Sequence, residues 1–196
     1  MKDNSFSSTK KPFGDVLNLN PMRIRLPFSR LCLLFVLFAL VSCKAEKHVA
    51  SGKKAEEVAL KKKYAGLMGV KENEITNITL YKFIDSWYNV PYKSAGKSKN
   101  GVDCSGFVSI LCQQVFNKVI GGSSASMFKA CNVVSEKNLE EGDLVFFKIN
   151  SDKVSHVGVY LKNRRFVHAS THKGVMINSL DEAYYKKYFY KGGRVK

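Results

Sequence analysis

Residues 103–116 read Asp-Cys-Ser-Gly-Phe-Val-Ser-Ile-Leu-Cys-Gln-Gln-Val-Phe, and they give the clearest helix signal in the chain. Asp103 is a good N-cap, because its carboxylate can accept a hydrogen bond from a free N–H group of the first turn. The apolar residues that follow recur at helical spacing and form one stripe: Cys104, Phe107, Val108, Leu111, Val115 and Phe116. We therefore predict a helix that begins at Cys104 and faces the core through this stripe.

The segments on either side of this helix indicate the fold class. Before it, apolar residues at helical spacing predict another helix over roughly residues 77–88, which Pro91 ends. After it, three runs rich in β-branched and aromatic residues predict strands over residues 144–147, 156–161 and 165–170. Helices that precede strands in this way indicate an α+β fold, in which helices pack on one side of an antiparallel sheet.

Cys104 is the first candidate for a catalytic residue. The helix dipole and the unpaired N–H groups at a helix start favour a thiolate, so we expect a lowered pKa and a nucleophilic sulfur at this position. A cysteine in a core helix is more often only a small apolar residue. Cys104 alone does not decide between these two interpretations.

Two histidines on successive strands favour the catalytic interpretation. If Leu161 pairs with Arg165 across a three-residue loop, Gly158 lies opposite His168. His156 is then a diagonal neighbour on the same face, about 7 Å away and within side-chain reach. A cysteine at a helix start together with two such histidines matches a papain-like site. The cysteine would be the nucleophile, His156 its base and His168 the group that orients the base.

Several motifs resemble those of the NlpC family of papain-like cell-wall cysteine peptidases. The resemblance covers residues 67–196 and is carried by five segments: Trp87-Tyr-Asn-Val-Pro-Tyr92, Gly101-Val-Asp-Cys-Ser-Gly-Phe-Val108, Glu141-Gly-Asp-Leu-Val-Phe-Phe147, Ser155-His-Val-Gly-Val-Tyr160 and Phe166-Val-His-Ala-Ser170. It implies a papain-like α+β fold and the same three catalytic residues. It further implies a peptidoglycan DL-endopeptidase that cuts the bond between γ-D-glutamyl and meso-diaminopimelate, without a metal ion or another cofactor.

The resemblance also assigns four residues to substrate binding. Tyr92 would lie beside the nucleophile, where its hydroxyl can bind or polarise the scissile carbonyl. Asp103, Ser105 and Ser155 would hold the stem peptide, and Asp103 and Ser155 in particular its free amine. The chain departs from the family after Tyr92, because Lys93-Ser-Ala-Gly96 keeps only the second of two usual glycines.

The N-terminus resembles a bacterial lipoprotein signal. The uncharged apolar run Leu31–Ser42 follows three arginines, and its twelve residues would span about 18 Å as a helix, too little for a hydrocarbon core of about 30 Å. It ends in Leu40-Val-Ser-Cys43, which resembles a lipobox and implies lipid attachment at Cys43. About twenty residues rich in Ser, Asn and Lys precede Met22, so Met22 is an alternative start.

These features predict three parts of the chain. Residues 1–42 would be an N-terminal extension and signal peptide, and residues 67–196 the peptidase domain. Residues 43–66, rich in Lys, Glu and Ala, would be the lipidated cysteine and a solvated, partly helical tether. The protein would then be a membrane-anchored lipoprotein of the cell envelope, held at the outer membrane in a Gram-negative cell.

The charge of the chain bears on its partners. Residues 44–196 contain 26 Lys and Arg against 14 Asp and Glu, a net charge of +12. An exported lipoprotein does not meet nucleic acid, so anionic lipid or cell-wall polymer is the expected partner, or the basic surface is simply solvated. We expect a monomer whose partners are peptidoglycan stem peptides and, through its lipid, a membrane.

Three alternatives remain open from the sequence. Cys112 and Cys131 could form a disulfide. One Cys and two His could instead hold a zinc ion, although no fourth ligand or carboxylate base stands near the histidines in sequence. The third alternative is a lipoprotein that binds peptidoglycan without cutting it, since such a protein would need the same cleft and basic surface.

Overall fold

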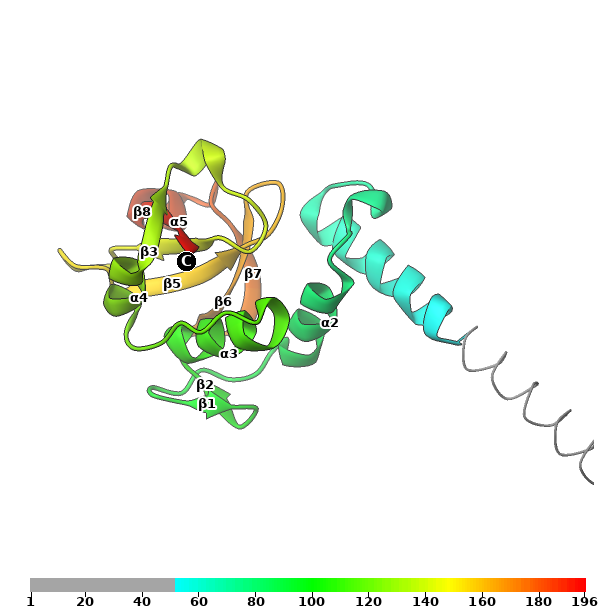
Figure 1. Ribbon diagram of the computed structural model, residues 1–196, viewed down its shortest axis with the longest axis horizontal. Helices are drawn as coiled ribbons and strands as arrows, with labels where there is room; N and C mark the ends of the chain where they lie inside the picture. The colour runs from blue at the N-terminus through cyan, green and yellow to red at the C-terminus, as the bar shows by residue number, and fades with distance from the viewer. Residues whose placement is uncertain (1–51) are drawn as a thin grey trace, which may run out of the picture. The chain divides into compact units, whose positions relative to one another are not determined.

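The computed structural model describes residues 52–196, which fold around one six-stranded antiparallel sheet (Figure 1). The strand order is β3-β8-β4-β5-β6-β7, and a two-stranded sheet of β1 and β2 lies apart from it. The elements are η1 (Glu72–Glu74), α2 (Ile78–Trp87), β1 (Lys97–Ser98), β2 (Gly101–Val102), α3 (Cys104–Phe116), α4 (Ser124–Ala130), β3 (Cys131–Val134), η2 (Glu136–Asn138), β4 (Leu144–Phe147), β5 (His156–Tyr160), β6 (Arg165–Ser170), β7 (Gly174–Ser179), α5 (Ala183–Tyr188) and β8 (Phe189–Val195).

The helix predicted from residues 103–116 forms and begins at the predicted residue. α3 begins at Cys104, and the Asp103 carboxylate accepts a hydrogen bond from the Gly106 N–H at 2.6 Å. Asn117 ends the helix in the left-handed region at a φ of 52°. The helix start that carries Cys104 is therefore fixed by an N-cap whose carboxylate satisfies an otherwise free N–H group.

The two faces of the sheet are covered by different elements. The main core joins α2 and α3 to one face, with Phe107, Leu111 and Val157 fully buried in it. A smaller cluster on the other face packs Val145, Phe147 and Phe166 with Tyr185 of α5. The predicted α+β fold, with N-terminal helices on an antiparallel sheet, is confirmed. The short C-terminal helix on the second face was not predicted.

Residues 52–66 differ from the expected solvated tether. A helix covers residues 52–68, and Leu60, Tyr64 and Met68 on one of its faces are buried in the main core. The Tyr64 hydroxyl donates to Asp85 at 3.2 Å, and the Asn163 amide donates to the Met68 carbonyl at 2.8 Å. Apolar residues at spacing i, i+4, i+8, together with the buried Ala65, attach this otherwise charged helix to the core.

Some of the predictions concern residues outside the part of the chain that the structure describes. Cys43, the apolar run 31–42 and the tether's first part, residues 43–51, all lie there. Within residues 52–196, none of the helices is both long and apolar enough to span a membrane. Cys112 and Cys131 are buried, and both are free thiols in the structure.

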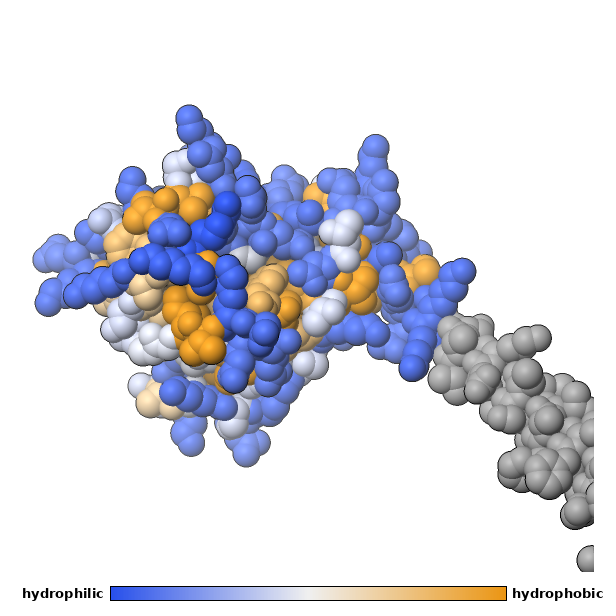
Figure 2. Space-filling model, viewed as in Figure 1, coloured by the Kyte–Doolittle hydropathy of each residue, from blue (hydrophilic) through white to orange (hydrophobic). Residues whose placement is uncertain are grey.

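Hydrophilic residues cover most of the face that Figure 2 shows, with smaller apolar groups between them. The exposed large apolar residues of the described part are Val58, Leu67, Val119, Val133, Tyr184 and Tyr190. Of these, Tyr184 also lines the cleft described below.

Candidate active site

The β5–β6 hairpin has the register that the sequence predicts. The Leu161 N–H donates to the Arg165 carbonyl at 2.8 Å, and Val159 pairs with Val167. Gly158 therefore lies opposite His168, and a Cβ atom added to Gly158 would be 3.2 Å from the His168 Cβ. The same added atom would be 2.8 Å from a ring carbon of Phe166. Glycine at this position leaves room for the neighbouring side chains.

His156 and His168 share one face of the sheet and contact each other. His156 Nε2 and His168 Nδ1 are 2.8 Å apart, and the two rings are perpendicular with centroids 5.0 Å apart. Phe147 packs against the His156 ring and Phe166 against the His168 ring, with centroid distances of 5.9 and 5.0 Å. The predicted same-face arrangement and odd-length loop are confirmed.

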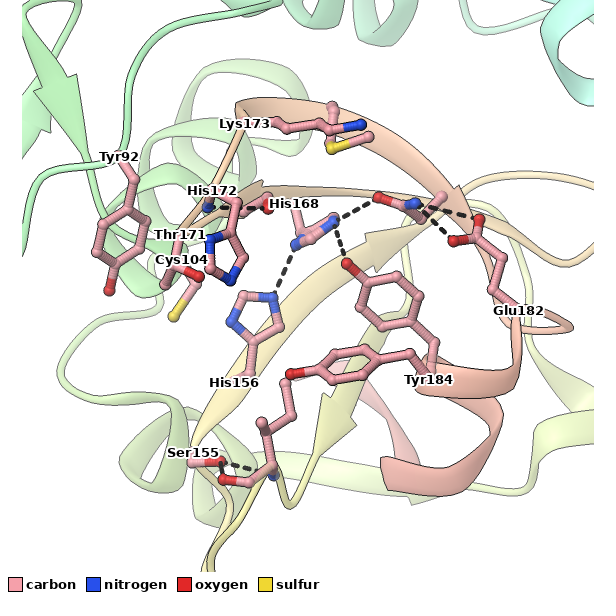
Figure 3. A pocket seen from close by; sticks show the side chains of 15 residues that line it. Tyr92, Cys104, Ser155, His156, His168, Thr171, His172, Lys173, Glu182 and Tyr184 are labelled. Atoms are coloured by element: carbon pink, nitrogen blue, oxygen red, sulfur yellow. Dashed lines mark hydrogen bonds between the residues drawn. The ribbon is translucent and has the colours of Figure 1, made fainter.

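Cys104 reaches the histidine pair from the start of α3. Figure 3 shows its sulfur beside the His156 ring, on the side of the ring nitrogen that does not contact His168. Backbone groups of Val157, Ser105 and Cys104 itself lie near enough to the sulfur to favour its ionised form. The structure thus brings together the three residues that the sequence singled out, in the order cysteine, His156, His168.

Burial sets the protonation state of this group. It lowers the pKa of His156 to about 3, and the nearby His168 adds to the shift. Burial also lowers the pKa of His168 to about 4, against upward contributions from its hydrogen bond to Asn178 and from the Glu182 carboxylate. Both imidazoles are therefore neutral at neutral pH.

The expected lowering of the Cys104 pKa is wrong. Burial raises the pKa of the thiol, and the nearby Asp103 carboxylate raises it further. The backbone N–H groups of Val157, Ser105 and Cys104 lower the pKa, but they do not overcome the effect of burial. The site at rest therefore holds a neutral thiol beside a neutral imidazole.

The four residues assigned to substrate binding occupy different surroundings. Tyr92 and Ser155 line the cleft, and burial raises the pKa of the Tyr92 hydroxyl. The Ser155 hydroxyl donates to the Ile149 carbonyl at 3.1 Å and accepts from the Ile149 N–H at 2.8 Å, so it closes the loop before β5. Asp103 and Ser105 bond each other at 3.0 Å, and neither lines the cleft.

Comparison with known proteins identifies the family. The NlpC/P60 family model matches residues 89–194, more than half of the chain. The chain belongs to the NlpC/P60 family. The resemblance to the NlpC family stated from the motifs is confirmed.

Named relatives of the NlpC/P60 chain agree with this assignment. The "Probable endopeptidase NlpC" of Escherichia coli (strain K12) is 39% identical over 113 residues, which cover 57% of this chain and 73% of that protein. The murein DD-endopeptidase MepS/murein LD-carboxypeptidase of the same strain is 38% identical over 128 residues, covering 63% and 68%. With these relatives, the family shows that the chain is an enzyme, a hydrolase of a cysteine peptidase family.

The solved structures show the same fold. An NlpC/P60 family protein from Bacillus cereus matches with a TM-score of 0.55 and 25% identity, over 61% of this chain. The chain spans only 40% of that protein, so the match covers the NlpC/P60 fold and not the rest of the relative.

The cleft of this NlpC/P60 domain has a volume of about 580 Å³, enough for a few residues of an extended peptide. Residues that the sequence analysis missed also line it. Thr171, His172 and Lys173 come from the β6–β7 turn, and Asn178, Glu182 and Tyr184 come from β7, the turn after it and α5. Asn178 lies on β7, a strand that the sequence analysis did not predict, so no signal in the sequence distinguished it from other polar residues.

Proposed function

We propose that the chain hydrolyses the peptide stems of peptidoglycan, with Cys104 as the nucleophile, His156 as the base and His168 as the residue that orients the base. The proposal rests on the position of the Cys104 sulfur beside His156 and on the contact between His156 and His168, at the wall of an open cleft. The two Escherichia coli relatives are an endopeptidase and a murein endopeptidase by name, which supports peptidoglycan as the substrate class.

The proposed first half-reaction is acyl transfer to sulfur. The Cys104 thiol gives its proton to His156 Nδ1 while the sulfur attacks the scissile carbonyl carbon. The Cys104 N–H and the Tyr92 hydroxyl would donate to the oxyanion, since both lie beside the sulfur. The tetrahedral intermediate then breaks its C–N bond, the leaving amine takes the proton from His156, and a thioester remains.

The second half-reaction restores the enzyme. A water molecule gives a proton to His156 Nδ1 and attacks the thioester carbonyl. The C–S bond breaks, the sulfur recovers the proton, and the stem leaves with a new carboxylate. His168 stays hydrogen-bonded to His156 throughout and keeps its ring orientation.

We further propose the bond and the place of the reaction. The bond would be the one between γ-D-glutamyl and meso-diaminopimelate, as the motifs imply. The protein would act in the cell envelope as a monomer, anchored to a membrane by lipid on Cys43, with the folded domain beginning near the helix over residues 52–68 rather than at residue 67.

Digestion of purified sacculi tests the proposal. The full chain in detergent should release new amines and carboxylates, and mass spectrometry of the soluble products should show stems that end at γ-D-glutamate. Products of cleavage at a D,D bond instead, the activity for which the relative MepS is named, would move the cleavage site but keep the enzyme class. Binding to sacculi with no cleavage by the wild-type protein would refute the catalytic proposal, and the Cys104→Ala variant is the matched control.

A further inference from the structure

Hydrogen bonds continue from His168 to the surface of the domain. His168 Nε2 contacts the Asn178 side-chain oxygen at 2.9 Å. The Asn178 side-chain nitrogen donates to both carboxylate oxygens of Glu182, at 2.8 and 3.1 Å. Glu182 is exposed, whereas both histidines are buried. Figure 3 draws this series from His156 through His168 to Glu182.

The carboxylate gives the series a single direction. An ionised carboxylate only accepts, so the Asn178 amide must turn its NH₂ group toward Glu182 and its oxygen toward His168. An amide oxygen also only accepts, so His168 must carry its proton on Nε2. Neutral His168 then has a bare Nδ1, which can only accept from His156 Nε2. His156 therefore carries its proton on Nε2 and leaves Nδ1 bare.

We infer that Asn178 and Glu182 are positioning residues that fix the tautomer of His156, so that its bare Nδ1 faces the Cys104 sulfur and can take the thiol proton. The inference deepens the proposed function and rests on it for the role of His156. Neither residue touches the reacting atoms, because His168 lies between them and His156.

The tautomer needs such a residue because neither histidine is charged at rest. A doubly protonated imidazole would donate from both nitrogens, but the lowered pKa values of both rings keep them neutral, with two tautomers each. The other contact of His168 Nε2 is the Tyr185 hydroxyl at 3.2 Å, which can donate or accept and so favours neither tautomer. Of these groups, only the Glu182 carboxylate is restricted to accepting, so it alone determines the direction of the hydrogen bonds in the series.

A purely structural role for Glu182 is the competing explanation. Its carboxylate also accepts the Ser179 N–H at 2.7 Å, in the turn between β7 and α5. Loss of Glu182 could therefore loosen this turn without any effect on tautomers. The test needs variants that preserve or reverse the direction of the series, and a readout of the protons themselves.

Three variants of the full chain in detergent separate these roles. Asn178→Leu removes the amide, so Glu182 no longer determines the direction of the hydrogen bonds at His168. Glu182→Lys places a donor where the acceptor was, so the amide turns over and donates to His168 Nε2. The double variant Asn178→Asp, Glu182→Gln keeps the direction, because the new carboxylate accepts from His168 and the new amide donates to that carboxylate.

Nitrogen-15 spectra of the histidine rings report the tautomers directly. The chain has four histidines, so variants at positions 156 and 168 assign the signals. In the wild type and the double variant at pH 7, both rings should be protonated on Nε2. In Glu182→Lys, His156 should be protonated on Nδ1, and in Asn178→Leu both tautomers should be present.

The kinetic expectation follows from the same protons. Asn178→Leu should lower kcat about 10- to 100-fold and Glu182→Lys about 10²- to 10⁴-fold, with KM within about threefold, since wrong-tautomer effects in catalytic triads reach about 10⁴-fold. The double variant should keep kcat within about fivefold of the wild type.

Each outcome decides for or against the inference. A wild-type His156 protonated on Nδ1, or unchanged tautomers in Glu182→Lys, refutes it, as does a double variant as slow as Asn178→Leu. If Asn178→Leu fails to fold, the wild-type spectrum and the other two variants still decide. A wild type that shows the expected tautomers but does not cut sacculi would overturn the proposed function and leave the tautomer assignment standing.

Discussion

Acid should destabilise this domain through its two buried histidines. The pKa of His156 is lowered to about 3 and that of His168 to about 4, from an ordinary value of 6.5 that both regain on unfolding. As the pH falls below 6.5, the histidines of the unfolded state bind protons while those of the folded state stay neutral. The contribution of the two histidines to stability is therefore complete above pH 6.5 and is lost as the pH falls toward their folded-state pKa values.

The size of this loss can be worked out. Between pH 7.5 and pH 5.5 the folded state keeps both rings neutral, while each ring in the unfolded state becomes mostly protonated. Over this pH interval the free energy of unfolding therefore falls by about 1.4 kcal/mol for each histidine and by about 3 kcal/mol for the pair. This is a large share of the 5 to 15 kcal/mol that is typical of a domain.

Urea unfolding followed by circular dichroism at the two pH values measures the loss. The control is the double variant His156→Gln, His168→Asn, which keeps His48, His172 and every carboxylate. The wild type should lose about 3 kcal/mol more than this variant between pH 7.5 and pH 5.5. Equal losses in the two proteins would show that the histidines are not held neutral by burial, and the resting state described here would be wrong.

Four further outcomes are expected. Sacculus cleavage should be undetectable in Cys104→Ala, nearly so in His156→Ala, and reduced about 10- to 10⁴-fold in His168→Ala, which only loosens the base; equal losses in all three would contradict the separate roles. Iodoacetamide should inhibit sacculus cleavage and EDTA should not. The rate at which Cys104 is alkylated should still rise with pH beyond the ordinary thiol pKa of 9.0, because burial raises the pKa of Cys104. Recovery of cleavage by zinc after chelation would instead support a metal site. Gly158→Ala should cost about 1 to 3 kcal/mol of unfolding free energy and lower kcat, since the new methyl group would lie 2.8 Å from Phe166 and 2.9 Å from the Val167 carbonyl; unchanged urea midpoint and kcat would refute the close approach. Cys43→Ala should leave the protein soluble or unprocessed, and a mature-size variant still in the membrane fraction would remove the lipid anchor from the proposal.

The sequence predicted the hairpin of the site because strand geometry leaves few choices. A side chain on a strand has only two faces, so an odd-length loop between Leu161 and Arg165 determines that His156 and His168 share one. The start of α3 was equally well determined, because an Asp N-cap and an apolar stripe both give the same boundary. Local rules that agree with each other make such features predictable.

Other features depend on contacts that no local rule contains. The helix over residues 52–68 attaches through a few buried apolar residues in a charged segment, and composition alone predicts a solvated segment there. Asn178 joins the site only because β7 pairs with β6 and turns into α5, a helix of six residues with little periodicity to predict it. The sign of the Cys104 pKa shift depends on depth of burial, which opposes the effect of the helix start.

The resting protonation states constrain how the proton moves during catalysis. With the pKa of His156 lowered and that of Cys104 raised, a thiolate and imidazolium pair is unfavourable before substrate binds. Proton transfer to His156 Nδ1 must then accompany attack on the carbonyl, when the charge that leaves sulfur moves on to the oxyanion. The positive charge that appears on His156 at that moment can be stabilised through His168 and Asn178 by the Glu182 carboxylate, because every hydrogen bond in that series points toward it. The residues that select the tautomer at rest are thus also oriented to support the charged base in the transition state.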